Sequence, residues 1–184
     1  PLQKQELSSV FCIAPSSKFR VVPLGFDLDR FFTNMDEKIV HGPTGATCLD
    51  LPSPYEAHKS GLLHLPRFIA KIRKHLNGQL PKSYQRNFTK GFDGFLCLHL
   101  NLDPAQIINC VKISNSEKEL EEELSKIFPS DLKVHEWNRK VVQMGTADMA
   151  KEKLEEVRRN LGAQDRMDLI SFADIIDFDE GKIF

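Results

Sequence analysis

Apolar residues recur at helical spacing from residue 61 onward, and the pattern is clearest in residues 61–78. The apolar side chains there share one helical face, and they are Phe68, Ile69, Ile72 and Leu76. A helix with such a face must bury it against another element. Pro66 suits the first turn, where its missing N–H costs nothing, and Gly78 suits the left-handed residue that ends a helix. Residues 61–78 therefore predict the first helix of a core.

The opposite face of this predicted helix is basic and carries Arg67, Lys71, Arg73 and Lys74. Charged helix faces are usually solvated, so we expect this face to lie in water. Binding of phosphate or RNA is the alternative, and the surface would then extend to Lys82, Arg86 and Lys90. The net charge is −1 and no aromatic residues interleave the basic ones, so nucleic acid is not an expected partner.

Further segments repeat the helical pattern with recognisable start signals. Residues that favour helix N-caps precede them, namely Asp103, Ser116, Thr146 and Ser171. Pro104 suits a first helical position, and Glu119 completes a capping box. The apolar faces lie within residues 92–102, 107–111, 120–128, 134–144, 150–161 and 172–176. Short helices joined by short loops predict an all-α fold, a compact bundle of about six or seven short helices.

Residues 1–58 differ from the rest, because Pro and Gly interrupt any apolar periodicity. The segment is too aromatic for a disordered linker, and its phenylalanines are Phe11, Phe19, Phe26, Phe31 and Phe32. Residues 19–22 could form one short strand ended by Pro23, and residues 29–35 could form a helical turn. We therefore divide the chain into an irregular N-terminal arm, 1–58, and a helical domain, 59–184.

Composition and cysteine use are those of a soluble globular protein. Of 184 residues, 41% are hydrophobic and 28% are charged, and no apolar run is long enough to span a bilayer. Cys12, Cys48, Cys97 and Cys110 are scattered without a Cys-x-x-Cys pair. They predict buried, reduced thiols and a reducing compartment, either cytoplasm or an organelle matrix. Because the chain begins at Pro1, we allow for a processed N-terminus.

No residue pattern matches a catalytic or metal-binding signature. The histidines have no His-x-x-x-His spacing, and we interpret His99, in an apolar run, as a buried and hydrogen-bonded residue. Residues 177–181 resemble the start of a calcium loop but lack its later glutamate. The glycine-rich residues 41–45 follow no clear strand and lack a phosphate-loop lysine, so they predict a turn. We expect no metal, cofactor or catalytic residue, and we favour a protein that is not an enzyme.

A pocket between the 61–78 helix and the helix of Trp137 is the best candidate for a binding site. Cationic groups and aromatic walls suit a small anionic ligand. The candidate ligand-binding residues are Arg67, Lys71, Arg73, Tyr84, His135, Trp137 and Asn138.

The order of several blocks resembles a mainly bacterial family, catalogued as the domain-of-unknown-function family numbered 5069. The blocks are residues 52–55 (PSPY), 61–73 (GLLHLPRFIAKIR), Gly78, Tyr84, 98–103, 116–124, 137–138 (WN), 160–162 (NLG) and 170–179. The resemblance implies the helical fold and brings no activity with it. Two departures stand out: Ala70 replaces an acidic residue of the family pattern, and the arm before Pro52 is extra.

Two functions remain open. The preferred one is a non-catalytic accessory or scaffold component that binds other protein subunits through the N-terminal arm, since aromatic Pro/Gly-rich segments gain order by packing along a surface. The alternative is an enzyme or binder of a small anionic metabolite, which would use the predicted pocket.

Overall fold

The structure is a computed structural model that describes residues 39–42 and 45–183, with only the backbone given at 39–42 and 45. The chain divides into two units, Pro1–Asn34 and Met35–Phe184, and all described residues belong to the second. The strand predicted at residues 19–22 and the helical turn at 29–35 lie outside the described residues. The division at residue 58 stays a prediction.

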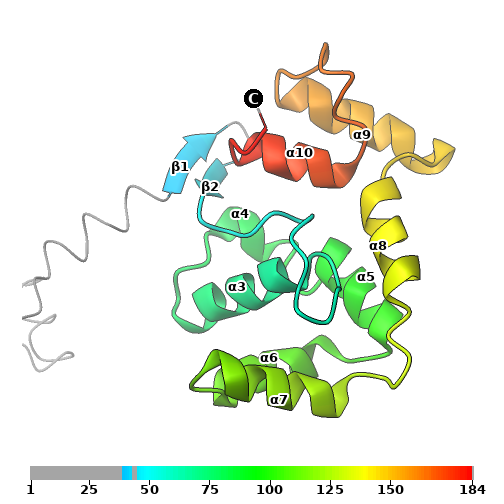
Figure 1. The fold of residues 1–184 in the computed structure, drawn as a ribbon. Coiled ribbons are helices and arrows are strands. Elements are labelled where there is room, and N and C mark those ends of the chain that lie inside the picture. The colour runs from blue at the N-terminus through cyan, green and yellow to red at the C-terminus, as the bar shows by residue number, and fades with distance from the viewer. Residues whose placement is uncertain (1–38, 43–44, 184) are drawn as a thin grey trace, which may run out of the picture. The chain divides into compact units, whose positions relative to one another are not determined.

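The described residues form one hairpin followed by helices (Figure 1). Strands β1 (Ile39–Gly42) and β2 (Gly45–Cys48) are antiparallel, with Ile39 opposite Cys48. The helices are α3 (Leu65–Leu76), α4 (Lys82–Gln85), α5 (Gly91–Leu100), α6 (Pro104–Ile113), α7 (Glu117–Ile127), α8 (Val134–Gln143), α9 (Asp148–Asn160) and α10 (Phe172–Asp179). The predicted all-α fold is confirmed.

The differences from prediction are local. Helix α4 lies between the predicted helical segments, where no helix was expected, and it is a single turn of four residues, too short to show a periodic pattern. Strand β1 begins just before the glycine-rich residues 41–45 and includes the first two of them, where the sequence indicated no clear strand. Among the described residues it pairs with β2, and at four residues it is too short to carry a long alternating pattern.

The main core lies among α3, α5, α6, α7 and α8. Its largest fully buried side chains include Trp137 of α8 and Phe68 of α3. Helix α3 packs on α6 and α5, α6 on α7, and α5 on α8. The buried face of α3 contains Phe68, Ile69 and Ile72, as its periodicity predicted. Leu76, assigned to the same face, is 43% exposed, because α3 ends there and its last turn projects beyond the core.

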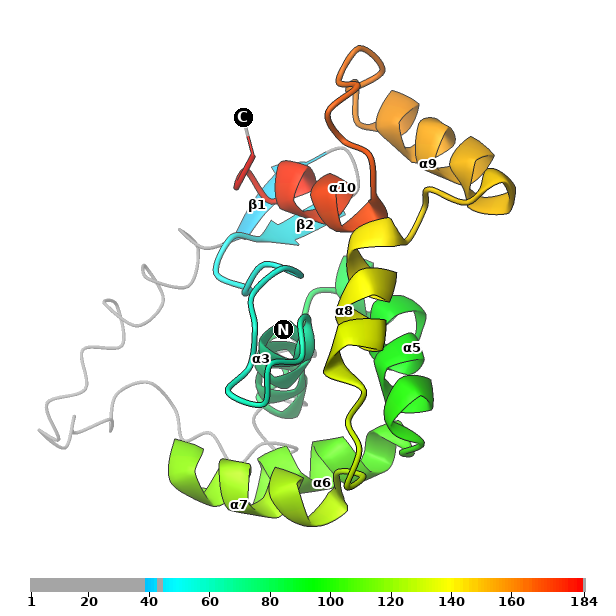
Figure 2. The same ribbon diagram turned by 45° about the vertical axis from the view of Figure 1, so that its right-hand side comes forward.

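A second, smaller core joins α9 to α10. It contains Leu154 of α9, Ile175 of α10, and Ala163 and Leu169 from the segment between them. Helix α10 also contributes Ala173 to the main core. In both views α9 lies well away from α6 and α7 (Figures 1 and 2). Helix α10 is therefore the element that joins the two cores.

Helix caps largely follow the sequence signals. Asp103 and Ser171 each form a complete capping box, with Gln106 and Asp174 as partners. Ser116 accepts a hydrogen bond from the Glu119 backbone N–H at 3.2 Å, but the Glu119 carboxylate accepts from Asn115 instead of closing the box. Thr146 caps no helix, because its hydroxyl donates to the Gln143 carbonyl at 2.8 Å and α9 begins after Ala147.

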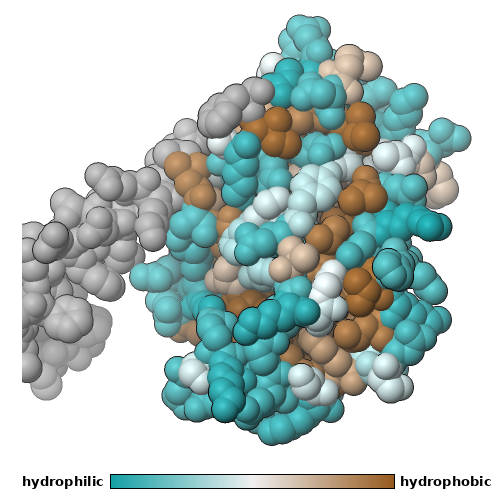
Figure 3. All heavy atoms as spheres, viewed as in Figure 1, coloured by the Kyte–Doolittle hydropathy of each residue, from teal (hydrophilic) through white to brown (hydrophobic). Residues whose placement is uncertain are grey.

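Within the described part of the chain, no helix is both long and apolar enough to cross a membrane. On the face drawn in Figure 3, apolar residues reach the surface in separate groups among polar ones. Small exposed apolar groups separated by polar residues are normal for folded proteins.

Candidate functional site

Arg67 and Lys71 do not lie in water, contrary to the expectation of a solvated basic face on α3. Arg67 is 3% exposed and Lys71 is 7% exposed. Buried cations are stable only with partners, and each of these has a carboxylate. The carboxylates are those of Glu180, at the end of α10, and Asp93 of α5. Ion pairs therefore connect α3 to both of these helices.

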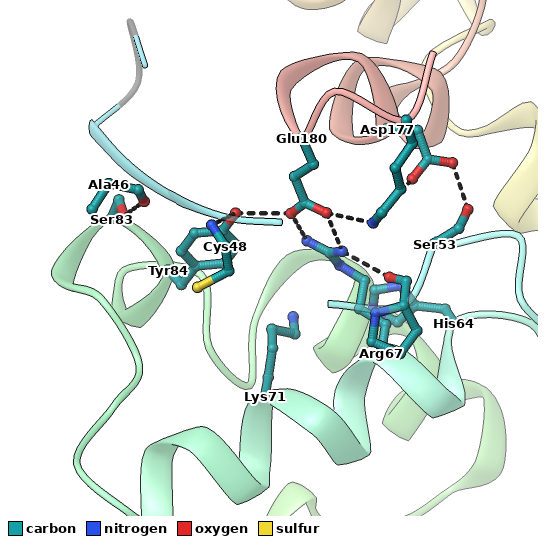
Figure 4. A network of polar contacts seen from close by, with 12 residues as sticks. Ala46, Cys48, Ser53, His64, Arg67, Lys71, Ser83, Tyr84, Asp177 and Glu180 are labelled. Atoms are coloured by element: carbon teal, nitrogen blue, oxygen red, sulfur yellow. Dashed lines mark hydrogen bonds and ion pairs between the residues drawn. The ribbon is translucent and has the colours of Figure 1, made fainter. Parts of the chain in front are cut away.

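The guanidinium of Arg67 binds the carboxylate of Glu180, the residue that ends α10 (Figure 4). Nη1 donates to Oε2 at 2.8 Å, and Nη2 donates to Oε1. Nη1 also donates to the carbonyl of Pro52 at 2.9 Å. Burial alone would raise the pKa of Glu180, but the hydrogen bonds and charge of Arg67 outweigh it and lower that pKa. Glu180 is therefore a buried carboxylate that is ionised at neutral pH.

Lys71 belongs to a second cluster with Asp93 of α5 and His64. The Lys71 ammonium donates to both Asp93 oxygens at 2.6 Å, and His64 Nε2 lies 2.8 Å from Oδ1. Burial lowers the pKa of His64 to about 4, so its ring is neutral at pH 7 and donates from Nε2. Burial would raise the pKa of Asp93, but the Lys71 charge lowers it. Burial also lowers the pKa of Lys71.

Helix α4 places Tyr84 between the hairpin and Glu180. The Tyr84 hydroxyl donates to Glu180 Oε1 at 2.8 Å and accepts from the Cys48 N–H at 3.1 Å. Ser83 fixes the same turn, because its hydroxyl donates to the Ala46 carbonyl at 2.6 Å. Burial and the Glu180 charge raise the pKa of Tyr84, so this hydroxyl stays a hydrogen-bond donor at neutral pH.

A cavity of about 680 Å³ opens above these groups, between α3, α4, α5, α9 and α10. Its polar end includes Arg67, Lys71 and Tyr84, and its apolar walls include Phe92 of α5 and Val157 of α9. The charged lining residues are Arg67, Lys71, Lys90, Asp179 and Glu180. These are three cations and two carboxylates, but Arg67 is paired with Glu180 and Lys71 with Asp93, which lies just behind the lining. A polar end of paired charges faces apolar walls.

The structure brings only part of the predicted set together. Arg67, Lys71 and Tyr84 line the cavity, whereas Arg73, His135, Trp137 and Asn138 do not. Arg73 is about half exposed and forms an ion pair with Glu117, and His135 is exposed. The cavity therefore lies beside α9 and α10 and not against the helix of Trp137. The ligand-binding role of the set stays a prediction.

Trp137 and Asn138 hold the segment that leads into α3. Trp137 Nε1 donates to the Leu63 carbonyl at 2.8 Å. Asn138 accepts from the Leu63 N–H at 3.0 Å and donates to the Gly61 carbonyl at 2.9 Å. His99 is hydrogen-bonded as interpreted from the sequence, with its Nε2 3.0 Å from the Leu132 carbonyl, but it is half-buried and not fully buried. These contacts give Trp137 and Asn138 a structural role.

The sequence interpretation missed His64, Asp93 and Glu180. A partial signal exists, because His64, Arg67 and Lys71 recur at intervals of three and four, the spacing of one helical face. That face adjoins the apolar stripe, which is where a buried polar cluster can form. Nothing local indicates Asp93 or Glu180 as its partners, since they lie 22 and 113 residues away.

Among the residues with described positions, no three His, Cys, Asp or Glu side chains come together as metal ligands. The model of the family described as "Domain of unknown function (DUF5069)" matches residues 50–182. No curated protein matches the chain.

Proposed function

Because the chain belongs to the family of the domain of unknown function DUF5069, whose description names no activity, we propose a function from the geometry of the cavity. The proposed function is the binding of a small amphipathic molecule with an apolar body and an anionic head. The observation that carries it is the cavity of about 680 Å³, whose polar end contains the carboxylate-binding guanidinium of Arg67 and whose walls are apolar. Small-molecule sites typically have volumes of about 300–1,000 Å³ and few polar groups.

Geometry supports an anionic head over a cationic one. The Arg67 guanidinium forms a planar fork that suits oxyanions, and the carboxylate of Glu180 occupies it in this structure. The apolar body would lie against Phe92, Val157 and Phe172. Burial of apolar surface there would supply the main free energy of binding, at roughly 25 cal/mol per Å² removed from water.

Matched eight-carbon probes test the proposal with the whole chain. Octanoate, 1-octanol and octylamine share an apolar body and differ in the charge of the head. We expect octanoate, at about ten times its Kd, to raise the melting temperature by about 3 °C. Octylamine should have no effect, because its ammonium would face Arg67 and Lys71 across the cavity. Isothermal titration calorimetry measures the affinities directly.

A blocking variant locates the site. Val157→Trp adds a large side chain to the cavity wall and should abolish octanoate binding. Glu152→Trp places the same side chain on the exposed face of α9 and should leave binding unchanged. Binding that survives Val157→Trp, or a stabilisation by octylamine equal to that by octanoate, would contradict the proposed function.

A role as a non-catalytic accessory component is a second candidate. Its support is the aromatic, Pro/Gly-rich composition of residues 1–58, with other protein subunits as the partners. Chromatography of cell extract on a sizing column, followed by blotting, would test it. Elution at the monomer mass in extract, with or without residues 1–38, would argue against it. The accompanying proposal of a reducing compartment is supported by the buried free thiols of Cys48, Cys97 and Cys110.

A further inference from the structure

The polar end of the cavity already holds a carboxylate that belongs to the chain, that of Glu180. Arg67 contacts both of its oxygens, and the Tyr84 hydroxyl donates to Oε1 at 2.8 Å. All three residues line the cavity. Two donors of a rigid fork, joined by a hydroxyl donor, are arranged for a planar carboxylate. The chemistry of the ligand can therefore be inferred from the Glu180 carboxylate, which occupies the site in this structure.

Glu180 lies directly after α10, so a change of its side-chain rotamer need not move that helix. Although the residue is buried, its carboxylate is bound by side chains, those of Arg67, Tyr84 and Lys182. Lys182, which donates to Glu180 at 2.6 Å, follows it in the chain and can move with it. Helix α10 stays attached by other contacts, including the hydrogen bond from the Ser53 hydroxyl to Asp177 at 2.5 Å. The same helix also contributes Ala173 to the main core.

Resting on the binding function proposed above, we infer that the anionic head of the ligand is a carboxylate that replaces Glu180 on Arg67 and Tyr84. Once Glu180 has moved out, Lys71 stays paired with Asp93, but the guanidinium of Arg67 loses its carboxylate partner. The polar end of the cavity then has one more uncompensated positive charge than before, which favours an anionic head. The carboxylate of Glu180 thus competes with the carboxylate of the ligand for Arg67 and Tyr84.

An internal competitor weakens binding in a predictable way. A group tethered on a short segment acts at an effective concentration in the millimolar range or above. A free carboxylate must therefore compete with Glu180, and its affinity for the native chain is low. Removing the charge of Glu180, while keeping its shape, should strengthen binding of carboxylates specifically.

Titration calorimetry with octanoate tests this on the full chain. For Glu180→Gln we expect an affinity about tenfold higher than for the native chain, because the competing charge is gone. The affinity for 1-octanol should stay the same. Asp168→Asn removes an equal charge from an exposed residue outside the cavity and should leave the octanoate affinity unchanged. Equal or weaker octanoate binding by Glu180→Gln would overturn the inference, as would an equal gain in Asp168→Asn.

A second measurement needs no substitution and so does not depend on how well Glu180→Gln folds. Hydrogen exchange of the native chain, followed by mass spectrometry, reports on residues 178–183. Octanoate should speed exchange there, because Glu180 and Lys182 leave their contacts, and 1-octanol should not. Slower or unchanged exchange with octanoate would count against displacement of Glu180.

The outcomes separate this inference from the proposed function. If octanoate binds more tightly than 1-octanol and octylamine, is blocked by Val157→Trp and is insensitive to Glu180→Gln, the proposed function is supported and the carboxylate exchange is wrong. If no probe binds either the native chain or Glu180→Gln, the proposed function itself fails.

Discussion

Arg67 and Arg73 are on the same helix, α3, but they differ in how far their side chains are buried. Arg67 is buried and bound to Glu180, while Arg73 forms an ion pair with Glu117 in which both side chains are largely exposed. Removing one partner of a buried pair leaves an uncompensated charge, whereas exposed pairs contribute little. Residue type and helical position alone therefore do not predict the cost of substitution.

We expect Arg67→Ala to lower the free energy of unfolding by about 3 kcal/mol, because Glu180 would lose its buried partner and keep only Tyr84 and Lys182. Arg73→Ala, the matched control, should change it by less than about 0.5 kcal/mol. Urea unfolding followed by circular dichroism measures both. Similar losses in the two variants would show that the Arg67–Glu180 pair is not buried in solution.

His64 predicts a loss of stability in mild acid. Its pKa is about 4 in the folded chain and about 6.5 when unfolded. As pH falls below 6.5 the unfolded chain takes up a proton that the folded chain does not, so folding is destabilised. The loss should be about 2 kcal/mol between pH 7 and pH 5. The pKa of His58 is also lowered by burial and acts in the same direction. Asp93, with a lowered pKa, contributes only below this window.

Urea unfolding at several pH values between 7 and 5 measures the His64 effect. The control is His64→Gln, whose amide can still donate to Asp93 but does not titrate. Its stability should depend less on pH than that of the native chain. An unchanged pH dependence in this variant would assign the effect to other groups.

At the scale of elements, the turn between α8 and α9 depends on Gly145. Its φ is +108°, which side chains rarely allow, and an added Cβ would lie 3.1 Å from the Phe172 ring. The neighbouring Met144 carbonyl accepts a hydrogen bond from the Phe172 N–H at 2.8 Å. This turn therefore sets how α10 meets the end of α8, at one edge of the cavity.

Gly145→Ala should cost about 3 kcal/mol, through backbone strain and contact with Phe172. The matched control is Gly78→Ala after α3, where φ is also positive but no atom lies within 4 Å of the added Cβ. It should cost only about 1 kcal/mol. Thermal unfolding of both variants compares the two costs. Equal costs would mean that Phe172 moves away freely.

At the scale of the whole described region, stability should be uneven. Leu154 is the only residue of α9 that is fully buried, and the cluster around it is small. Helix α3, in contrast, buries Phe68, Ile72 and several others in the main core. Local opening costs least where few apolar contacts are lost.

Amide hydrogens of α9 should therefore exchange about tenfold faster or more than those of α3. Hydrogen exchange followed by mass spectrometry measures both helices in one sample, with α3 as the internal reference. Saturating octanoate should slow the exchange of α9, because Ala150, Val157 and Leu161 form part of the cavity wall. Equal protection of α3 and α9 without ligand would show that the two cores open together.

Local signals predicted most helices and few of the site contacts. Apolar periodicity, Pro104, Ser171 and Gly78 mark helices α3 and α5–α10, since each signal acts within one or two turns. Helix α4 and the two strands of the hairpin were not predicted, because four residues each are too few to show a periodic pattern. Of the candidate site residues, Arg67, Lys71 and Tyr84 line the cavity, whereas Trp137 and Asn138 serve the packing of α3.

The sequence by itself determined which segments are helical and which faces are apolar, because these depend on neighbours three or four residues away. Only the tertiary structure decided that Arg67 and Lys71 are buried and that Glu180 and Asp93 compensate them. A charged side chain looks the same in the sequence whether it faces water or a carboxylate 113 residues away. Its burial depends on how α10 returns to α3, and that packing also forms the cavity.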